Sequence, residues 1–325
     1  MLQPEFKKYG AEGYKKALQD TRYHLQFFLN AYEKDSFALF DSYMKWCYAL
    51  FHRINLPSNT LSTSFQVMRD TLLEYTEEES EKEQIMYFIN NALDKLSHYH
   101  EPESFIKKEN PYYEILSDYS KLVLENQKRE ASKLILDMVK SGTDIGKIYY
   151  HVFQPFQYEI GRLWQTNNIT VAQEHYATAV TQLIMSQLYE YIFAGSKKPY
   201  TFVGTCIEGE LHELGMRMIT DYIETQGWST YYLGANTPIE DIPKTLIDKH
   251  ADVAGISVTM LFNIEKAEEL ISLIRKEMGN SIKVLVGGYP FSIDSELSRK
   301  IGADAHSKDI TTIEQTIHEI LKVNK

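Results

Sequence analysis

The spacing of hydrophobic positions changes once along the chain, near residue 199. Before that point, apolar residues recur about every three or four positions, the period of a helix with one buried face. Two prolines in the stretch 97–111 interrupt this period and indicate a linker. We therefore expect an all-helical first domain over residues 1–105. Its helices are predicted over residues 14–32, 36–54 and 61–96, the last range holding two.

A second helical block covers residues 112–195. It is interrupted at 141–146 and 166–170, where Gly, Asn, Ser and Thr gather. Such residues end one helix and cap the next, and Asn168 or Thr170 is expected to cap the helix that follows. Helices joined by short loops pack antiparallel, so this block predicts a four-helix bundle.

After residue 199 the chain alternates short β-branched or aromatic runs with helical stretches. Repetition of strand and helix produces a parallel sheet covered by helices on both faces. Residues 199–325 are therefore expected to form a flavodoxin-like, Rossmann-like sheet of five parallel strands. The predicted fold class is helical domains followed by an α/β domain. The strands are predicted at residues 200–205, 229–234, 253–259, 282–288 and 303–307.

Composition narrows the classes of function. A hydrophobic fraction of 43% indicates a folded globular protein. The net charge of -11 argues against a general surface for nucleic acid or for an anionic membrane, because phosphates require clustered Lys and Arg. Only Cys47 and Cys206 occur, in no metal-ligand spacing, which favours a reducing cytoplasm. No apolar run approaches the length of a membrane span, so a cytoplasmic protein is expected.

Ligands of open α/β sheets bind at the carboxyl ends of the strands, so the residues just after each strand are the candidates. There the sequence places a histidine among glutamates, then two hydroxyl residues, then a pair of glycines. Two glycines without a Cβ let a ligand approach the backbone. These groups are expected to converge on one slot. The candidates are Glu210, His212 and Gly215 after the first strand, Ser257 and Thr259 at the end of the third, and Gly287 and Gly288 after the fourth.

The slot does not have the sequence of a nucleotide-binding loop. G-x-G-x-x-G and the P-loop pattern are both absent, and the acidic stretch 208–213 would repel a pyrophosphate. Glu210 is well placed to accept the second ring N–H of a metal-binding His212 if this loop is not helical. On this motif alone, His212 is equally well an ordinary residue of a first helical turn, among acids that favour a helix N-terminus.

The motifs "ELHELG", "SVT" and "VGGYPF", followed by "IGADAHSKD", resemble the cobalamin-binding domain family over residues 199–325. That family has D-x-H-x-x-G, then S-x-T or S-x-L, then G-G, in the same order. The resemblance implies that His212 binds the cobalt of cobalamin from below, with Glu210 as its partner in place of the commoner Asp. It also implies a slot for the nucleotide tail of the cofactor at Ser257, Thr259, Gly287 and Gly288.

The stretch "WQTNNITVAQEH" has the pattern W-x9-E-H. It is similar to the adenosylcobalamin-dependent photoreceptors of the CarH and LitR type, in which these residues surround the adenosyl group. The resemblance implies that Trp164 forms an apolar wall, and that Glu174 and His175 line two sides of the pocket without pairing. Taken alone, Trp164 fits a bundle core and the other two a helix surface. Gln165 stands where some of these photoreceptors have a second cobalt-binding histidine, which leaves His175 as the substitute.

Residues 1–105 show no helix-turn-helix with a basic recognition helix, unlike those photoreceptors. We therefore expect the output to pass to a protein partner. The aromatic-rich first domain would serve as a docking module, as the interface of a homo-oligomer, or as a second sensor. The resemblance implies a cobalamin-binding regulator, not an enzyme, with adenosylcobalamin as cofactor and light as a candidate signal. One alternative is a corrinoid carrier of a methyltransferase system, although no zinc-thiolate site is visible. Another is an interaction scaffold that has lost the cofactor.

Overall fold

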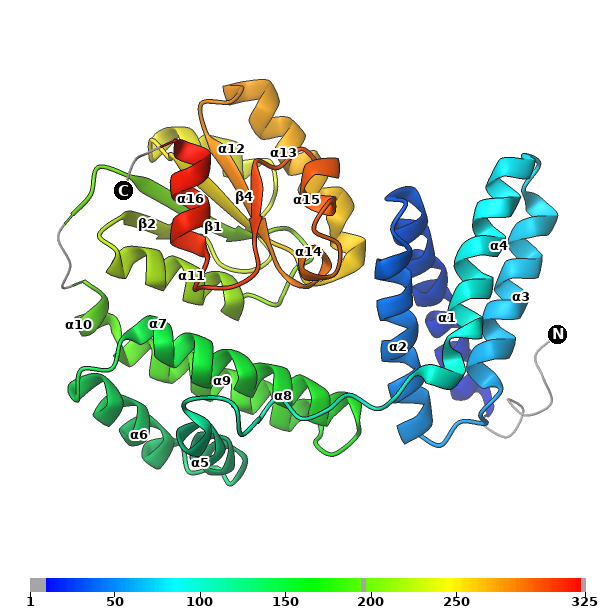
Figure 1. Ribbon diagram of the computed structural model, residues 1–325, viewed down its shortest axis with the longest axis horizontal. Coiled ribbons are helices and arrows are strands. Elements are labelled where there is room, and N and C mark those ends of the chain that lie inside the picture. The colour runs from blue at the N-terminus through cyan, green and yellow to red at the C-terminus, as the bar shows by residue number, and fades with distance from the viewer. Residues whose placement is uncertain (1–9, 194–196, 323–325) are drawn as a thin grey trace. The chain divides into compact units, whose positions relative to one another are not determined.

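The structure, a computed structural model, describes residues 10–193 and 197–322 (Figure 1). Its contacts divide the chain into two compact units, residues 1–101 and 102–325. The predicted domain limits at 1, 195 and 325 lie outside the described residues. Helical bundle and sheet are thus two parts of the second unit, and their separation into domains stays a proposal.

The first unit is helical, as its hydrophobic spacing predicts. Aromatic rings fill its core: Phe40 is fully buried and lies edge-on to Phe28 (5.4 Å between ring centroids) and Phe65 (5.7 Å). Buried His24 hydrogen-bonds Tyr43 through Nδ1 (2.7 Å), and burial lowers the His24 pKa to about 4. This histidine is therefore a neutral core residue at pH 7. The helices are α1(Gly10–Glu33), α2(Phe37–Arg53), α3(Thr60–Tyr75), α4(Glu79–Asp94) and the short η2(Leu96–His98).

The second unit begins with the predicted bundle. Thr170 caps α9 in a reciprocal pair with Gln173, whose backbone N–H it accepts and whose side-chain oxygen accepts the Thr170 N–H. The cap predicted at this position is therefore confirmed. The central helix of the bundle, residues 145–165, contains a π-helical turn that was not predicted. One extra residue in a turn hardly disturbs the hydrophobic spacing of a helix, so the sequence pattern does not reveal it. The elements are α5(Tyr113–Leu124), α6(Lys128–Lys140), α7(Ile145–Ile148), the π-turn η3(Tyr149–Phe153), α8(Gln154–Gln165), α9(Val171–Gln187) and α10(Tyr189–Ile192).

The sheet that follows has five parallel strands in the order β2-β1-β3-β4-β5. This is the flavodoxin-like order, so the fold-class prediction is confirmed. The strands are β1(Thr201–Cys206), β2(Ser229–Tyr232), β3(Val253–Ser257), β4(Lys283–Gly287) and β5(Ala305–Ser307). The helices are α11(Leu214–Thr225), α12(Asp241–Asp248), η4(Leu261–Asn263), α13(Ile264–Met278), α14(Tyr289–Ile293), α15(Leu297–Lys300) and α16(Ile313–Leu321).

Helices cover both faces of the sheet (Figure 1). On one face, α11 and α16 share a hydrophobic cluster with Phe202 of β1. The helix α11 packs tightly there, because a Cβ at Gly204 would lie only 2.5 Å from Thr220 Oγ1. The same helix contacts the bundle: a Cβ at Gly146 of α7 would meet the ring of Tyr222 at 2.7 Å. One helix, α11, is therefore shared by the bundle and the sheet.

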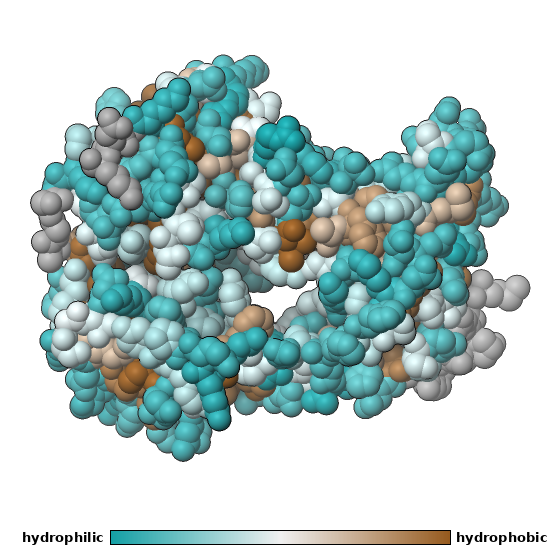
Figure 2. Space-filling view, in the orientation of Figure 1, coloured by the Kyte–Doolittle hydropathy of each residue, from teal (hydrophilic) through white to brown (hydrophobic). Residues whose placement is uncertain are grey.

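The surface is mainly polar. On the face shown in Figure 2, hydrophilic residues predominate and apolar ones form small groups. Among the residues that the structure describes, no helix combines the length and the apolar character of a membrane span.

A buried tyrosine–carboxylate pair joins the π-turn to α11. Tyr149 OH donates to Asp221 Oδ2 (2.9 Å), and both residues are buried. Burial raises the pKa of Asp221 to about 6, although the hydrogen bond from Tyr149 and the charge of Arg217 act in the opposite direction. Because the folded-state pKa exceeds the unfolded value of 3.8, the ionised carboxylate costs stability. This cost grows as the pH rises from about 4 to about 6.

The substitution Asp221→Asn should therefore stabilise the protein at neutral pH. An amide oxygen still accepts the Tyr149 hydroxyl but carries no buried charge, so the free energy of unfolding should rise by about 1–3 kcal/mol at pH 7. The gain should shrink toward zero near pH 4. Denaturant unfolding at both pH values measures it, with exposed Asp248→Asn as the control. A variant no more stable than the natural protein at pH 7 would contradict the charge penalty.

Candidate functional site

The loop after β1 positions the candidate histidine. Gly209 has a φ of +84°, a left-handed conformation that suits glycine, and the turn lets Glu210 N donate to Ile207 O (2.9 Å). Because α11 begins only at Leu214, His212 lies in the loop and not in a helical turn. Glu210 was expected to pair with the imidazole only if this loop is not helical, and the loop is not helical.

The Glu210 carboxylate joins the loop after β1 to the loop after β3. Its Oε1 accepts hydrogen bonds from Nδ1 (2.6 Å) and the backbone N (3.0 Å) of His212. Its Oε2 accepts from the backbone N–H groups of Thr259 (2.8 Å) and Met260 (3.0 Å) and from Nδ2 of Asn263 (3.0 Å). The strand order reverses between β1 and β3, which is where open α/β sheets bind ligands.

Burial and charge fix the protonation of this pair. Burial alone would raise the pKa of Glu210, but the hydrogen bonds from His212, Met260 and Thr259 outweigh it and lower the pKa to about 2. The carboxylate is therefore ionised and can only accept, so Nδ1 of His212 carries the proton. The Glu210 side chain is fully buried, whereas that of His212 is 58% exposed. This arrangement leaves Nε2 as the ring nitrogen that a metal can reach.

The hydrogen bond from Glu210 also makes His212 more basic. It raises the pKa of His212, burial partly offsets this, and the charges of Glu210 and Glu174 raise it further. A more basic imidazole is a stronger donor to a metal, once the metal has displaced the proton.

The ends of β1, β3 and β4 lie on one rung of the sheet. Ser257, which is buried, pairs with Cys206 on one side and with Gly287 on the other. Gly288 has a φ of +109°, and a Cβ there would lie 1.9 Å from Val258 O. Gly288 is thus required by the close approach of two backbone segments, independently of any ligand.

The substitution Gly288→Ala should destabilise the second unit. The left-handed φ and the clash with Val258 together should lower the free energy of unfolding by about 2–4 kcal/mol. Gly215→Ala is the matched control, because its Cβ would meet nothing within 4 Å at the start of α11. The control should be neutral or stabilising by about 0.5–1 kcal/mol. Equal thermal unfolding of the two variants would show that the contact at Gly288 is not required.

A buried hydroxyl without a partner lies at the same edge. Among the described residues, Thr205 Oγ1 is one of the buried side-chain atoms that make no hydrogen bond, and Thr205 is 1% exposed. Such a hydroxyl costs about 1–3 kcal/mol, so a water or a ligand is expected to satisfy it. Sequence reasoning missed Thr205, because threonine is an ordinary strand residue. Cys206, the next residue, pairs with Ser257, so the side chains of Thr205 and Ser257 leave opposite faces of the sheet.

The bundle reaches the histidine loop through Glu213. The residue follows His212 directly, and its Oε1 accepts from Gln182 Nε2 of α9 (2.8 Å) while its Oε2 accepts from Tyr232 OH of β2 (2.9 Å). Leu211, on the other side of His212, is 72% exposed. His212 therefore lies between Glu213, which is fixed by two hydrogen bonds, and Leu211, whose apolar side chain is exposed.

The W-x9-E-H residues gather at one end of the bundle. Trp164 ends α8 and is 38% exposed, and a short loop leads to Glu174 and His175 in the first turns of α9. The helix α9 contacts the histidine loop through Gln182 and Glu213 (2.8 Å), and the charge of Glu174 contributes to the raised pKa of His212. The structure therefore brings the two sets of predicted residues to the same region.

One detail of the prediction is wrong. His175 Nδ1 hydrogen-bonds Glu174 Oε2, although the two side chains were expected not to pair. Neighbouring residues leave a helix about 100° apart, but these side chains are long enough to bend toward each other at a solvent-exposed helix end.

Thr178 lies between Glu174 and the bundle core. Its hydroxyl is 3.2 Å from Glu174 Oε1 and 3.0 Å from Gln157 Oε1, and its single hydrogen can be donated to only one of these two acceptors at a time. Gln157 Nε2 donates to Thr181 Oγ1 (2.9 Å), and the hydroxyl of Thr181 hydrogen-bonds that of Tyr119 (3.0 Å). Gln157 therefore competes with Glu174 for the hydroxyl of Thr178.

Comparison with known proteins identifies both parts of the second unit. Residues 200–312 match a family model described as a B12 binding domain, and residues 115–189 match a second model with the same description. The dimethylamine corrinoid protein of Methanosarcina barkeri is 28% identical over 129 residues, 39% of this chain and 59% of that protein. The transcriptional repressor CarH of Myxococcus xanthus is 26% identical over 155 residues, 47% of this chain and 51% of the repressor.

A solved structure shares the fold. The monomethylamine corrinoid protein of Methanosarcina barkeri superposes with a TM-score of 0.56 at 18% identity, over 66% of this chain and all of that one. The chain spans only about 59% of the length of the first dimethylamine corrinoid proteins that it matches. On these matches, residues 115–189 and 200–312 belong to B12-binding domain families, and they correspond to the helical bundle and the parallel sheet of the second unit.

Proposed function

We propose that the second unit holds cobalamin at the edge of the sheet, with Nε2 of His212 as the lower ligand of cobalt. The observation that carries this proposal is the pair in which buried Glu210 orients an exposed imidazole. A carboxylate that accepts the second ring N–H is the usual support of a metal-binding histidine. The cofactor supplies a cobalt–carbon bond, a reactive group that amino acids lack.

The remaining predicted residues keep their proposed places around the cofactor. The polar nucleotide tail would lie at the ends of β3 and β4, beside the buried residue Ser257, and the bundle would cover the upper face. The proposed tail slot is Ser257, Thr259, Gly287 and Gly288; Gly215 completes the histidine motif; the proposed cover is Trp164, Glu174 and His175.

For the whole chain, we favour a corrinoid carrier that passes a methyl group between protein partners. Support comes from the relatives named dimethylamine corrinoid proteins, of which several species of Methanosarcina provide examples. In this proposal His212 and Glu210 hold the cobalt while the partners react at its upper face. The light sensor inferred from the W-x9-E-H pattern has less support from these relatives.

A sensor remains a second candidate because of one observation. The charge of Glu174 acts on His212, and Trp164 lies exposed at the same end of the bundle, as a cover over an adenosyl group requires. CarH is among the relatives. In this reading adenosylcobalamin holds the bundle on the sheet, and loss of the adenosyl group changes a contact with a protein partner.

One experiment distinguishes these functions. The full chain is incubated separately with methylcobalamin and adenosylcobalamin, freed of excess cofactor, and followed by absorbance and elution volume in darkness and after green light. A carrier should retain methylcobalamin at least as tightly as adenosylcobalamin, transfer its methyl group to a thiol, and elute unchanged after light. A sensor should retain adenosylcobalamin at least about 10-fold more tightly and change its elution volume. Retention of neither cofactor would contradict both.

Thr178 offers a sharper test of the upper face. Thr178→Val keeps the shape of the side chain but removes the hydroxyl that can donate to Glu174. In a sensor, affinity for adenosylcobalamin should fall about 5–20-fold while that for methylcobalamin stays constant, because only the adenosyl ribose offers hydroxyls to Glu174. Thr178→Ser keeps the hydroxyl and should behave like the natural protein. Unchanged affinities in all three proteins would favour the carrier.

A further inference from the structure

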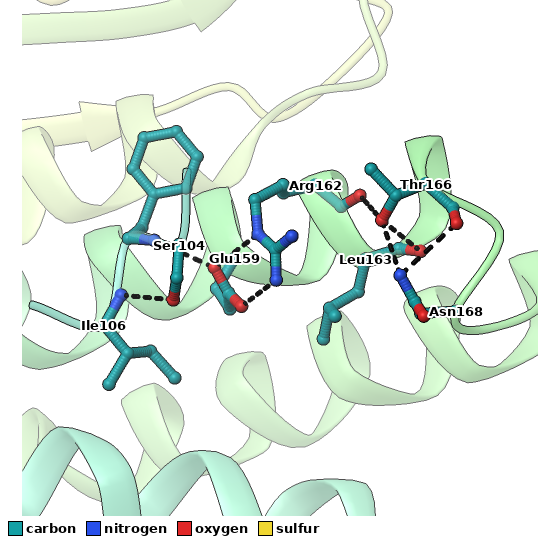
Figure 3. Close-up of polar contacts among 8 residues, drawn as sticks. Ser104, Ile106, Glu159, Arg162, Leu163, Thr166 and Asn168 are labelled. Carbon is teal, nitrogen blue, oxygen red and sulfur yellow. Dashed lines mark hydrogen bonds and ion pairs between the residues drawn. The ribbon is translucent and has the colours of Figure 1, made fainter. Parts of the chain in front are cut away.

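A segment without regular structure joins the first unit to the bundle and is held along α8. Residues 102–110, here called the strap, directly follow the first unit, which ends at residue 101. Phe105 N donates to Glu159 Oε2 of α8 (2.9 Å), and Ile106 N donates to Ser104 Oγ (3.1 Å) inside the strap (Figure 3). The Phe105 ring also contacts the ring of Tyr158 (5.3 Å between centroids).

The other end of the strap is attached at the π-turn. Asn110 Nδ2 donates to the carbonyl oxygen of His151 (2.8 Å). Tyr112, just beyond the strap, stacks on the ring of His151 (5.3 Å). A π-turn departs from the usual helical hydrogen bonds, and Asn110 supplies a donor to one of its carbonyl groups. The strap is therefore fixed at two points of the central helix of the bundle.

The carboxylate of Glu159 is buried and ionised, and it accepts a hydrogen bond from the strap. Glu159 is 5% exposed, and Arg162 of the same helix donates hydrogen bonds to its carboxylate from Nε (2.9 Å) and Nη2 (2.6 Å). Burial would raise the pKa of Glu159, but the hydrogen bonds from Arg162, Phe105 and Ser104 lower it, so the group is ionised at pH 7. A buried carboxylate that needs the Phe105 N–H as a partner makes docking of the strap specific.

The same helix ends at the proposed cofactor site. Trp164 lies two residues after Arg162, and the helix end is closed by Thr166 Oγ1, which donates to Arg162 O (2.7 Å), and by Asn168 Nδ2, which donates to Thr166 Oγ1 (2.7 Å) (Figure 3). Glu159 and Trp164 lie less than two turns apart on one hydrogen-bonded helix. A shift at Trp164 is therefore also a shift at Glu159.

We propose that cofactor binding tightens the docking of the strap, the segment that follows the first unit, with Glu159 as the positioning residue. This rests on the proposed binding of cobalamin over His212. A corrin that covers exposed Trp164 holds the end of α8, and a fixed α8 holds the strap more tightly. By thermodynamic reciprocity, a strap that is released must weaken cobalamin binding by the same factor, although Glu159 does not face the cofactor.

The amide hydrogen of Phe105 reports on this coupling directly. Hydrogen exchange of the peptide that contains it is measured by mass spectrometry in the full chain, with and without saturating hydroxocobalamin. In the natural protein, loading should slow exchange at least about 5-fold, the lower end of ordinary coupling between sites. In Glu159→Gln, exchange should be fast in both states, and the affinity for hydroxocobalamin should fall by the factor that loading produced in the natural protein.

Two further variants keep the test decisive. Tyr158→Ala removes only a contact of a half-exposed ring, so it should fold even if Glu159→Gln does not, and it should reduce both effects in parallel. Glu103→Gln is the control, since it removes a strap charge that is 85% exposed, and it should change neither effect. The corrin absorbance shows whether the protein is saturated with hydroxocobalamin. If it is saturated and the exchange rate of the Phe105 amide is unchanged, the coupling alone is overturned. No binding of hydroxocobalamin would overturn the proposed function, and the coupling with it.

Discussion

Replacing Glu210 with alanine should lower the free energy of unfolding of the second unit by about 3–5 kcal/mol. The substitution leaves the partly buried N–H groups of Thr259 and Met260 and the buried amide of Asn263 without this acceptor, and a buried group left unpaired costs about 1–3 kcal/mol. It also releases the loop after β1 from the loop after β3. This is the largest stability effect that we expect from one side chain at the site.

Tryptophan fluorescence can isolate this effect. The chain has three tryptophans, so in a Trp46→Phe background only Trp164 and Trp228 of the second unit report on urea unfolding. Glu208→Ala is the control, because its carboxylate is half exposed and its ion pair with Lys266 should contribute less than about 1 kcal/mol. A loss for Glu210→Ala no larger than that of the control would show that the carboxylate does not hold the two loops together.

The stabilisation by Glu210 should also depend on pH. The folded-state pKa of about 2 lies below the unfolded value of 4.5. The contribution is therefore complete above about pH 4.5 and is lost as the pH falls toward 2. The difference in stability between the natural protein and Glu210→Ala should narrow over this range.

Removing the imidazole should cost most of the cobalamin affinity. In His212→Ala the cobalt has no lower ligand from the protein, and the dissociation constant should rise at least about 100-fold, because loss of a mere hydrogen-bond partner of a metal ligand already costs 10–100-fold. Stability should fall less than in Glu210→Ala, since Glu210 Oε1 loses the Nδ1 donor but keeps the backbone N–H of residue 212. Titration with hydroxocobalamin, followed by absorbance, measures the constant.

Three further measurements test whether His212→Ala weakens binding by removing the ligand of cobalt. Free imidazole should restore the spectrum of the His212→Ala complex by filling the vacant position. Glu210→Gln should weaken binding by an intermediate factor of about 10–100. His175→Ala, on the bundle side, should leave the lower ligand in place. An affinity of His212→Ala within about threefold of the natural protein would rule out this residue as the ligand.

Local periodicity was sufficient to predict the architecture. The alternation of strand and helix after residue 199 led to a five-stranded parallel sheet. The sequence left open whether His212 lies in a loop or in a first helical turn, and the start of α11 at Leu214 decides for the loop. Residues at strand ends could be assigned to one edge because parallel strands all end on the same side. Such inferences need only neighbours in sequence and one rule of topology.

Contacts between distant residues could not be predicted in this way. Asn263 is 53 residues from Glu210, and Phe105 is 54 residues from Glu159, so nothing in the local pattern marks either pair. Gly288 resembled a ligand contact, yet its role depends on where the backbone of Val258 passes. The pairing of Glu174 with His175 depends on side-chain rotamers, which helical spacing does not determine.

The most direct test of the account is the electron paramagnetic resonance spectrum of the bound cofactor in its Co(II) state. The chain is prepared with ¹⁵N-labelled histidine and loaded with unlabelled cobalamin, so that only a histidine of the protein can bring ¹⁵N to the metal. Ligation by His212 predicts that each cobalt line splits into two in the labelled protein and into three in the unlabelled one, and that His212→Ala loses this difference. A threefold splitting that labelling does not change would place the cofactor's own base on cobalt and contradict the central claim.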